Sequence, residues 1–364
     1  MSSPNPAESR EKELRVVAIG GGTGLSTLLR GLKRYVASPE RRRGIRIGGA
    51  TVAQAPAPLP CPSLRCHVRE LSAVVTVTDD GGSSGRLRED MQMLPPGDIR
   101  NCMVALSEDE HLLAKLFQFR FEQGDLEGHS FGNLFVAALT QITGDFAQAV
   151  QMSSQILAAR GKIFPSTNVN VGLVAEMEDG SLVRGETNIT ASKKSIVELR
   201  LEPEKADPLP ETLEAIAHAD LITLGPGSLY TSLITNLLVR GIPEALAASK
   251  ATKVFVCNLM TQANESLGLS ASQHIEKILQ HVDGPRGPIF DYALINTGPI
   301  SAARLEQYAR EGQEPIVADL NRVRALGVEP VTGNFVHEGD VLRHDYDRVA
   351  ERVLALGLGP LVTA

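Results

Sequence analysis

Short apolar runs alternate with amphipathic stretches along most of the chain. The run LRVVAIGGG, over residues 14–22, indicates a buried strand that ends in glycines. Apolar residues then recur at helical spacing, at Leu25, Leu28, Leu29, Leu32 and Val36. A strand, a glycine turn and a helix in this order are typical of the first unit of a nucleotide-binding α/β fold.

The segment that follows this helix has a different character. Residues 38–70 are rich in Pro, Arg and Gly and have no sustained apolar period, which predicts a long inserted loop that is mobile. The run LSAVVTVT, residues 71–78, indicates the second strand. Residues 1–12 are polar and are expected to be disordered, and residues 13–364 are expected to form a single domain.

Residues 102–160 carry three amphipathic stretches with no strand pattern between them. This predicts a group of helices that forms a lid beside the sheet. The next run, VGLVAEMEDGSLVRGET, indicates a hairpin that turns at Asp179-Gly180. A third antiparallel strand is expected in SIVELRLEP, residues 195–203.

The alternation of strands and helices resumes after residue 218. ADLITLGPGS indicates a strand that ends in a second glycine turn, and KVFVCNLM, DYALIN and EPIVAD indicate three more short strands. Such alternation implies a mostly parallel sheet with helices on both faces. The predicted fold is therefore Rossmann-like α/β, with a helical lid and a small antiparallel hairpin element.

Composition narrows the classes of function. The 364 residues are 43% hydrophobic, enough for a sizeable core, and the net charge of −7 disfavours a nucleic-acid or anionic-membrane surface. With 4% aromatic residues and no Trp, base-stacking platforms are disfavoured too. No apolar stretch reaches the ~18 residues of a spanning helix, and no apolar signal region begins the chain. We expect a cytoplasmic protein without nucleic-acid partners or membrane insertion.

The four cysteines form no CxxC pair, which disfavours a zinc knuckle or a thioredoxin-like site. Cys61, Cys66 and His67 are close in sequence and could bind a metal. Free thiols in a reducing compartment are the simpler interpretation.

The first glycine turn is a candidate phosphate site and comprises Gly20, Gly21, Gly22, Thr23 and Gly24. Glycines at the end of a strand let the backbone approach a diphosphate, and the N–H groups of the next helix favour negative charge. Leu25 stands where the GxGxxG pattern has its third glycine, and no GKS or GKT follows. A turn without a ligand is the alternative, but four glycines exceed what a turn needs.

Two adjacent carboxylates, Asp79 and Asp80, follow the second strand. A Rossmann unit places an acid about 20 residues after the glycines. Gly24 and Asp79 are 55 positions apart, and removal of the 33-residue insertion leaves 22. The two acids could bind ribose hydroxyls, hold Mg²⁺ against a diphosphate or take a substrate proton. A simple turn is the alternative, although it does not explain why both acids fall at this edge.

The loop after these acids could wrap a ligand through Gly81, Ser83 and Ser84, with Arg86 or Arg88 available to a phosphate. The segment LPPGDIRNC adds Asp98, Arg100 and Asn101. An internal contact between Asp98 and Arg100 and a ligand role for Arg100 are equally compatible with this pattern.

The segment GHSFGNL places His129, Ser130 and Asn133 before an apolar helix. A catalytic Ser–His pair is disfavoured because the GxSxG pattern is absent. We expect Ser130 to be a helix N-cap and Asn133 to be a ligand contact.

The second glycine turn carries Gly225, Gly227 and Ser228, which could hold another phosphate or a carboxylate at a helix N-terminus. A further strand ends in CNLMTQ, with Asn258, Thr261 and Gln262. In an open α/β sheet these strand ends meet at one edge, where ligands bind. Their convergence is stronger support for a site than any one motif.

Six segments carry a resemblance to a known family: IGGGTGLSTLLRGLK, TVTDDGGSSGRLR, LPPGDIRNCMVAL, GHSFGNLFVAALTQITGDF, GPGSLYTS and CNLMTQ. The sequence resembles the bacterial gluconeogenesis factors (YvcK-like proteins), which are related to CofD-type 2-phospho-L-lactate transferases, over roughly residues 14–36 and 71–320. The resemblance implies a Rossmann-like core with a helical lid and binding of UDP-sugars such as UDP-N-acetylglucosamine. It also implies a role in cell shape and envelope synthesis on gluconeogenic carbon sources, with no reaction securely attached.

For the related transferases, the resemblance implies transfer of a phospholactyl group from a nucleoside diphosphate carrier to a deazaflavin hydroxyl with Mg²⁺. The family's site carries over to Gly20 through Gly24, to Asp79 and Asp80, and to Asn258. The insertion at 38–70 is one departure from the family. The other is that Leu267, Leu269 and Gln273 stand where the family tends to have Asp, an aromatic residue and Asp, which puts ligand preference in question.

The sequence therefore favours a regulatory factor that binds a UDP-sugar or another nucleoside diphosphate ligand. No cofactor is expected except Mg²⁺ at Asp79 and Asp80, and a homodimer is compatible with the sequence. The alternative is a Mg²⁺-dependent transferase in which Asp79 and Asp80 are catalytic. An NAD-dependent dehydrogenase is disfavoured by the incomplete GxGxxG pattern and by the lack of an obvious catalytic His.

Overall fold

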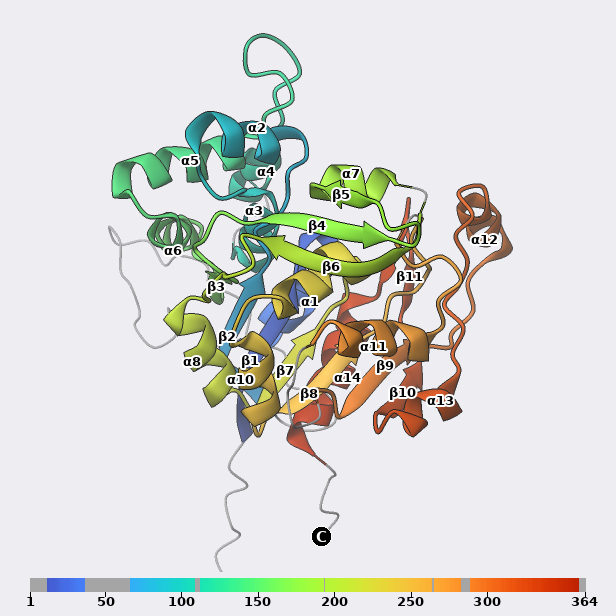
Figure 1. The fold of residues 1–364 in the computed structure, drawn as a ribbon. Helices are drawn as coiled ribbons and strands as arrows, with labels where there is room; N and C mark the ends of the chain where they lie inside the picture. The colour runs from blue at the N-terminus through green and yellow to red at the C-terminus, as the bar shows by residue number, and fades with distance from the viewer. Residues whose placement is uncertain are drawn as a thin grey trace, which may run out of the picture.

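A seven-stranded sheet forms the centre of the computed structural model, which describes residues 12–36, 66–108, 112–192, 194–263, 265–282 and 289–359 (Figure 1). The strand order is β10-β9-β8-β7-β1-β2-β3, and every neighbouring pair is parallel. The strands are β1 (Lys12–Gly20), β2 (Cys66–Val75), β3 (Lys162–Pro165), β7 (Leu221–Leu224), β8 (Thr252–Val256), β9 (Tyr292–Asn296) and β10 (Glu329–Gly333). This arrangement confirms the predicted Rossmann-like α/β class.

The strand order reverses beside β1. The chain runs outward from β1 to β2 and β3, and then returns to place β7 on the other side of β1. Parallel pairing aligns Ile19 with Leu224, so both strands end at the same level. In open α/β sheets, a reversal of this kind leaves a crevice at the carboxyl ends of the two strands.

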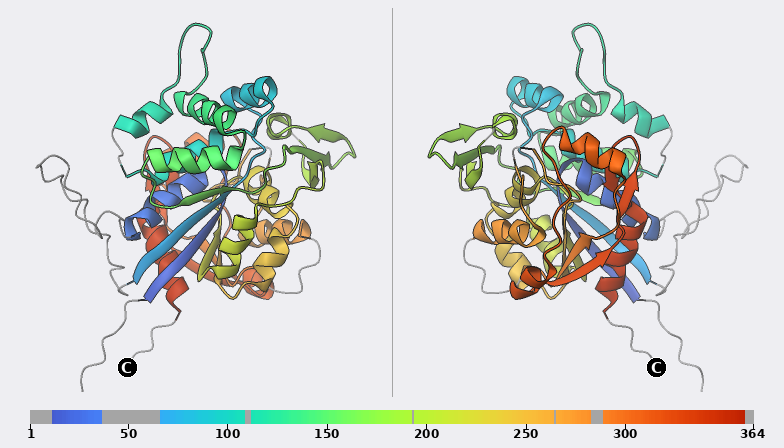
Figure 2. Two further views of the ribbon diagram at one scale, coloured as in Figure 1. Left: turned by 90° about the vertical axis from the view of Figure 1, so that its left-hand side faces the viewer. Right: turned by 90° about the vertical axis from the view of Figure 1, so that its right-hand side faces the viewer.

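Helices cover both faces of the sheet, as the two side views show (Figure 2). One face carries α1 (Gly22–Leu32), α3 (Gly97–Leu106) and α14 (Tyr346–Leu358), which pack on one another and on the sheet. The other face carries α8 (Pro210–His218) and α10 (Ile242–Ala248). Residues Val16–Ile19 of β1 and Ala73–Val75 of β2 are at most 2% exposed, as expected for strands that are covered on both faces.

Further helices extend from this core. They are α2 (Gly82–Met91), α4 (Leu112–Gln118), α5 (Phe131–Thr143), α6 (Phe146–Ile156), α7 (Glu186–Ala191), α9 (Thr235–Leu237), α11 (Ala271–Gln280), α12 (Ala302–Ala309) and α13 (Leu320–Ala325). The chain also has a 3₁₀ turn, η1 (Lys33–Tyr35), and a π-helix, η3 (Leu229–Ile234). The described part of 102–160 is helical with no named strand, and its role as a lid stays a prediction. None of the helices in the described ranges is long and apolar enough to span a bilayer.

Two small antiparallel sheets accompany the main one. The first contains β4 (Gly172–Met177), β5 (Leu182–Arg184) and β6 (Ile196–Glu202) in the order β5-β4-β6. It confirms the predicted hairpin, whose turn is closed by the Gly180 N–H donating to the Met177 carbonyl, and the third strand. The second pairs β11 (Val336–Glu338) with β12 (Leu342–His344).

Two strand assignments from the sequence were wrong, and two strands of the sheet were not predicted. The second strand begins at Cys66, because residues 66–70 pair with the start of β1 and do not belong to a loop. EPIVAD, residues 314–319, is not in the sheet, because its backbone bonds to the loop after β8, with the Ile316 N–H donating to the Leu259 carbonyl. The outer strand is β10, and the edge strand β3 was not predicted. Residues 1–11 and 37–65, with Cys61, lie outside the described residues.

Candidate functional site

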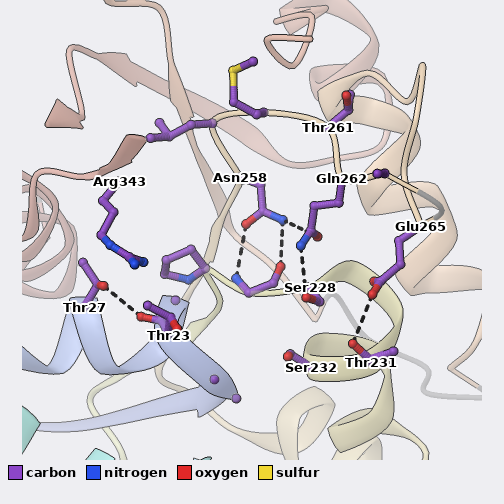
Figure 3. Close-up of a pocket in the computed structure, with 18 of the residues that line it drawn as sticks. Thr23, Thr27, Ser228, Thr231, Ser232, Asn258, Thr261, Gln262, Glu265 and Arg343 are labelled. Atoms are coloured by element: carbon purple, nitrogen blue, oxygen red, sulfur yellow. Dashed lines mark hydrogen bonds between the residues drawn. The ribbon is translucent and has the colours of Figure 1, made fainter. Parts of the chain in front are cut away.

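A cavity of about 690 Å³ opens at the carboxyl ends of β1, β7 and β8 (Figure 3). The β1–α1 turn forms one wall, and the β7–η3 turn together with the loop after β8 forms another. Helix α7 and strand β12 contribute further side chains, among them Glu186, Thr190, Arg343 and His344. The cavity therefore lies where the reversal of strand order predicts a ligand site.

The first glycine turn lines this cavity through Gly21, Gly22, Thr23 and Gly24, whereas Gly20 ends β1 and is not in the lining. Gly22 has a φ of +58°, a conformation that favours glycine. No side chain caps the start of α1 from its N-cap position, Gly21. The N–H groups of the first helical turn therefore stand at the wall of the cavity, which is the arrangement predicted for a phosphate site.

Gly24 has a different role from its neighbours. A Cβ atom on Gly24 would lie 2.3 Å from the Pro226 carbonyl oxygen and 2.9 Å from the Gly227 nitrogen. The two glycine turns therefore touch through bare backbone, and Gly24 is required by this contact.

Asn258 holds the second glycine turn. Its Oδ1 accepts from the Gly227 N–H at 3.2 Å, and its Nδ2 donates to the Gly227 carbonyl at 2.7 Å. Gln262 continues the network by donating from Nε2 to Ser228 Oγ at 3.0 Å (Figure 3). The predicted residues Gly227, Ser228 and Asn258 thus meet in the cavity wall, and Asn258 fixes the shape of the turn.

Glu265 caps the N-terminus of η3, the helix that follows this turn. Its Oε2 accepts from the Tyr230 N–H and its Oε1 from the Thr231 hydroxyl, both at 3.2 Å. Burial raises the pKa of Glu265, while these hydrogen bonds oppose the rise. The N-terminus of η3, where the sequence suggested a second phosphate or carboxylate, is therefore met by a carboxyl group of the chain itself.

Asp98, the second residue of α3, lies beside the first residues of α1 and lines the cavity. Desolvation raises the pKa of Asp98 to about 7, the nearby charge of Asp79 adds to the rise, and a hydrogen bond from the Gly22 N–H and the charge of Arg100 oppose it. The Arg100 guanidinium donates to Ser130 Oγ at 2.6 Å and to Asn101 Oδ1 at 2.7 Å. Asp98 lines the cavity and Arg100 does not, so the ligand role expected for Arg100 stays a prediction.

The two predicted acids after β2 lie beside the cavity and are not part of its lining. Asp79 Oδ1 accepts from the Gly81 N–H at 3.0 Å. Asp80 Oδ1 accepts from the Thr187 N–H at 2.8 Å and from its hydroxyl at 2.6 Å. Within the described residues, no group of three or more His, Cys, Asp or Glu side chains is arranged to hold a metal ion. The predicted Mg²⁺ at this pair stays a prediction.

Ser83, Ser84 and Asn133 meet in a buried polar cluster outside the cavity lining. Asn133 Nδ2 donates to Ser83 Oγ at 3.1 Å and to Ser84 Oγ at 3.5 Å, and His129 Nδ1 lies 3.1 Å from Ser83 Oγ. Ser130 accepts from the Asn133 N–H and caps α5, as predicted. The ligand roles expected for Gly81, Ser83, Ser84, Arg100 and Asn133 stay predictions.

Several lining residues were not found from the sequence, namely Thr27, Glu186, Thr190, Glu265, Tyr308, Gln313, Arg343 and His344. Arg343 projects from β12 across the cavity toward Thr23 and Thr27 (Figure 3). Beside it, burial lowers the pKa of His344 to about 4, and a contact with the Cys257 carbonyl at 3.1 Å opposes this effect. Most of these residues have no local pattern that marks them, because they belong to segments that are distant in sequence from the glycine turns.

The segment that departs from the family pattern barely contributes to the cavity. Between residues 263 and 273, the lining includes only Ala263 and Glu265 among the described positions. Gln273 closes a capping box with Ser270 at the start of α11, where its Oε1 accepts from the Ser270 N–H at 2.8 Å. Leu267, Leu269 and Gln273, at which the chain departs from the family pattern, are therefore not part of the cavity lining.

An open parallel sheet with a polar crevice at its switch point, bounded by two glycine turns, defines the class of α/β proteins that bind ligands at strand ends. Residues 16–336 match the model of the family described as 2-phospho-L-lactate transferase CofD. The chain belongs to this family.

Curated relatives agree with this assignment. The chain is 46% identical over 345 residues to a gluconeogenesis factor of Halalkalibacterium halodurans, with 94% of this chain and 96% of the relative covered. It is 42% identical over 344 residues to the gluconeogenesis factor of Bacillus subtilis, covering 94% and 98%. A crystal structure of a UPF0052 family protein from Bacillus halodurans is 45% identical with a TM-score of 0.82, and the match covers 94% of this chain and 99% of that one. The resemblance to gluconeogenesis factors is confirmed.

Proposed function

We propose that this protein is a cytoplasmic regulatory factor that binds a UDP-sugar, such as UDP-N-acetylglucosamine. Its role would be to support cell shape and envelope synthesis during gluconeogenic growth. The names of its relatives support the gluconeogenic setting. The observation that carries the binding proposal is the cavity in which the N-terminus of α1 faces Arg343 and the Asn258-held turn.

The parts of a nucleotide sugar match the parts of this cavity. Its volume of about 690 Å³ lies within the range of small-molecule sites. A diphosphate would be bound by the N–H groups at the start of α1 and by Arg343. The hydroxyl and amide groups of Ser228, Thr231 and Gln262 could bind sugar hydroxyls and base edges.

A metal ion would have a limited place in this binding. The described residues offer no cluster of three ligating side chains, so a Mg²⁺ ion would arrive with the diphosphate and keep waters as its other ligands. Binding with only a modest dependence on Mg²⁺ is therefore part of the proposal.

The test is a calorimetric titration of the full chain with UDP-N-acetylglucosamine, a GDP-sugar and NAD, each with and without Mg²⁺. We expect saturable binding of the UDP-sugar at one site per chain and weaker binding of the other two. Preferred binding of NAD, or no binding of any nucleotide, would refute the proposal.

A Mg²⁺-dependent transferase is the second candidate, and the match to the CofD family model favours it. The deciding experiment incubates the protein with a phospholactyl nucleoside diphosphate, the deazaflavin alcohol and Mg²⁺, and follows release of the nucleoside monophosphate. Multiple turnovers that disappear in Asp79→Asn would establish the transferase, whereas no release under conditions of demonstrated binding supports the regulatory factor.

A further inference from the structure

The start of α1 is met by a carboxyl group of the chain itself. Asp98 takes a hydrogen bond from the Gly22 N–H, the first residue of the helix. The same helix end is the place where a phosphate oxygen would bind in the proposed function. A bound diphosphate and the Asp98 carboxyl therefore come together at one set of N–H groups.

The position of Asp98 depends on the absence of two side chains. A Cβ atom on Gly21 would lie 2.7 Å from Asp98 Oδ2, and one on Gly22 would lie 3.7 Å from Asp98 Oδ1. Because both positions are glycine, the carboxyl can reach the backbone of the turn. It also borders the cavity and so can touch a ligand that enters it.

The acids around Asp98 disfavour a negative charge on Asp98 itself. Asp79 faces it from the loop after β2, Glu186 from α7, and Arg100 and the Cys102 thiol from its own helix, α3. Arg100 is the cation in this set, and its guanidinium already donates to Ser130 and Asn101. The pKa of Asp98 is accordingly raised to about 7 by burial and by Asp79 before any ligand is present. A diphosphate bound without Mg²⁺ would add two negative charges near Asp98 and raise the pKa of this carboxyl further.

We infer that Asp98 binds the ligand as a neutral acid that donates a hydrogen bond from its carboxyl O–H to a phosphate oxygen, so that ligand and proton are taken up together. This inference rests on the proposed function, because it assigns a role at the same cavity. The Gly22 N–H continues to donate to the other carboxyl oxygen. Asp98 is then a ligand-binding residue whose affinity for a diphosphate depends on pH.

The first measurement is proton uptake by the full chain. UDP-N-acetylglucosamine is titrated without Mg²⁺ at pH 6 and pH 8 in pairs of buffers with different ionisation enthalpies, which yields the number of protons bound with the ligand. We expect close to one proton at pH 8 and close to none at pH 6, where Asp98 is already neutral. Affinity should fall about tenfold for each pH unit above 7. His344 stays neutral throughout this range because burial lowers its pKa to about 4.

Variants identify the group that takes the proton. Asp98→Asn keeps an acceptor for the Gly22 N–H and presents an N–H donor to the phosphate, so it should bind with the same affinity at pH 6 and pH 8 and without proton uptake. Asp98→Ala should also lose the pH dependence and bind more weakly than Asp98→Asn. Glu186→Gln should retain proton uptake. Asp179→Asn, on the β4–β5 hairpin outside the cavity lining, is the matched control and should behave like the wild type.

Each contrary result has a distinct meaning. A wild-type protein that binds the UDP-sugar without proton uptake refutes the inference and leaves the proposed function intact. Uptake that persists in Asp98→Asn or vanishes in Glu186→Gln refutes it as well. Loss of both affinity and Mg²⁺ dependence in Asp98→Asn would make Asp98 a metal ligand and also overturn the inference. Failure of the wild type to bind any nucleotide sugar at either pH would refute the proposed function itself.

Discussion

The Asp80 carboxylate accepts two hydrogen bonds from Thr187, one from its N–H at 2.8 Å and one from its hydroxyl at 2.6 Å. This contact joins the loop after β2 to the start of α7, across 107 positions of sequence. Gly185, with a φ of +88°, makes room for it, since a Cβ there would lie 2.5 Å from Asp80 Oδ2. Helix α7 carries Glu186 and Thr190 into the cavity wall, so Asp80 positions that wall.

The first prediction separates positioning from direct binding. Asp80→Ala and Thr187→Val should each destabilise the protein by about 1–2 kcal/mol in denaturant unfolding, and their effects should be non-additive because they share one contact. If Asp80 acts by holding α7, both variants should weaken ligand binding to a similar degree. A large loss of affinity in Asp80→Ala with none in Thr187→Val would instead place Asp80 on the ligand.

The second prediction contrasts two glycines of the first turn. Gly24→Ala places a methyl group against the Pro226 carbonyl and should lower the free energy of unfolding by about 2 kcal/mol or more. Gly22→Val has more space, with Asp98 as its nearest neighbour at 3.7 Å, and its cost comes mainly from the φ of +58°, about 1–2 kcal/mol.

The order of the two variants should be reversed in calorimetric binding, where Gly22→Val should lose more nucleotide affinity than Gly24→Ala. Gly22→Val projects its side chain at the cavity wall and should reduce nucleotide affinity well beyond its effect on stability. An unchanged dissociation constant in folded Gly22→Val would show that the diphosphate does not approach this turn.

The third prediction concerns Arg343. Arg343→Gln removes a cation from the cavity and should weaken binding of a UDP-sugar by about 10–100-fold, the size expected for a hydrogen-bonded contact with a charged group. Binding of uridine, which has no phosphate, should change little. Arg324→Gln is the control, because Arg324 pairs with Glu329 outside the cavity lining. Equal losses for uridine and the UDP-sugar would argue against a phosphate contact.

The fourth prediction is the pH dependence of stability. Burial raises the pKa of Asp98 from an ordinary value near 3.8 to about 7, so the folded state binds a proton more tightly than the unfolded state. Its contribution to stability is therefore complete below about pH 4 and is lost as pH rises through 7. Asp98→Asn should be more stable than the wild type at pH 8, by about 2 kcal/mol, and this advantage should shrink toward pH 4. Thermal melts at pH 4, 6 and 8 measure the difference, and a constant offset would contradict the assignment.

The sequence was informative where structure follows from local pattern. The alternation of apolar runs and amphipathic stretches located most strands of the sheet, and Asp179-Gly180 located the hairpin because a tight turn needs a residue with positive φ. Strand β3 was not predicted, because it has only four residues and ends in Pro165 at the edge of the sheet. EPIVAD is more apolar than the later EPVTG, and yet tertiary pairing places EPVTG in the sheet.

The candidate site was predictable where it follows glycine turns and strand ends, as for Ser228 and Asn258. Glycine turns can be recognised from composition, so Gly22, Gly24 and Gly227 were predicted. Glu265 and Arg343 were not, because Glu265 lies in the cavity wall beside η3 and Arg343 points toward α1, and these elements are distant from them in sequence. For the same reason the sequence did not show that Asp98 borders the cavity, since this depends on how α3 packs against α1.

The bare-backbone contact between Gly24 and Pro226 has a consequence for how this protein can be divided. The two turns are separated by about 200 positions, so neither the N-terminal nor the C-terminal half of the chain contains a complete binding wall. Fragments produced by cutting the gene between α5 and α6 should be unable to bind on their own and should recover binding only when they reassociate. A substitution that enlarges either turn would therefore have to be accommodated by the other turn.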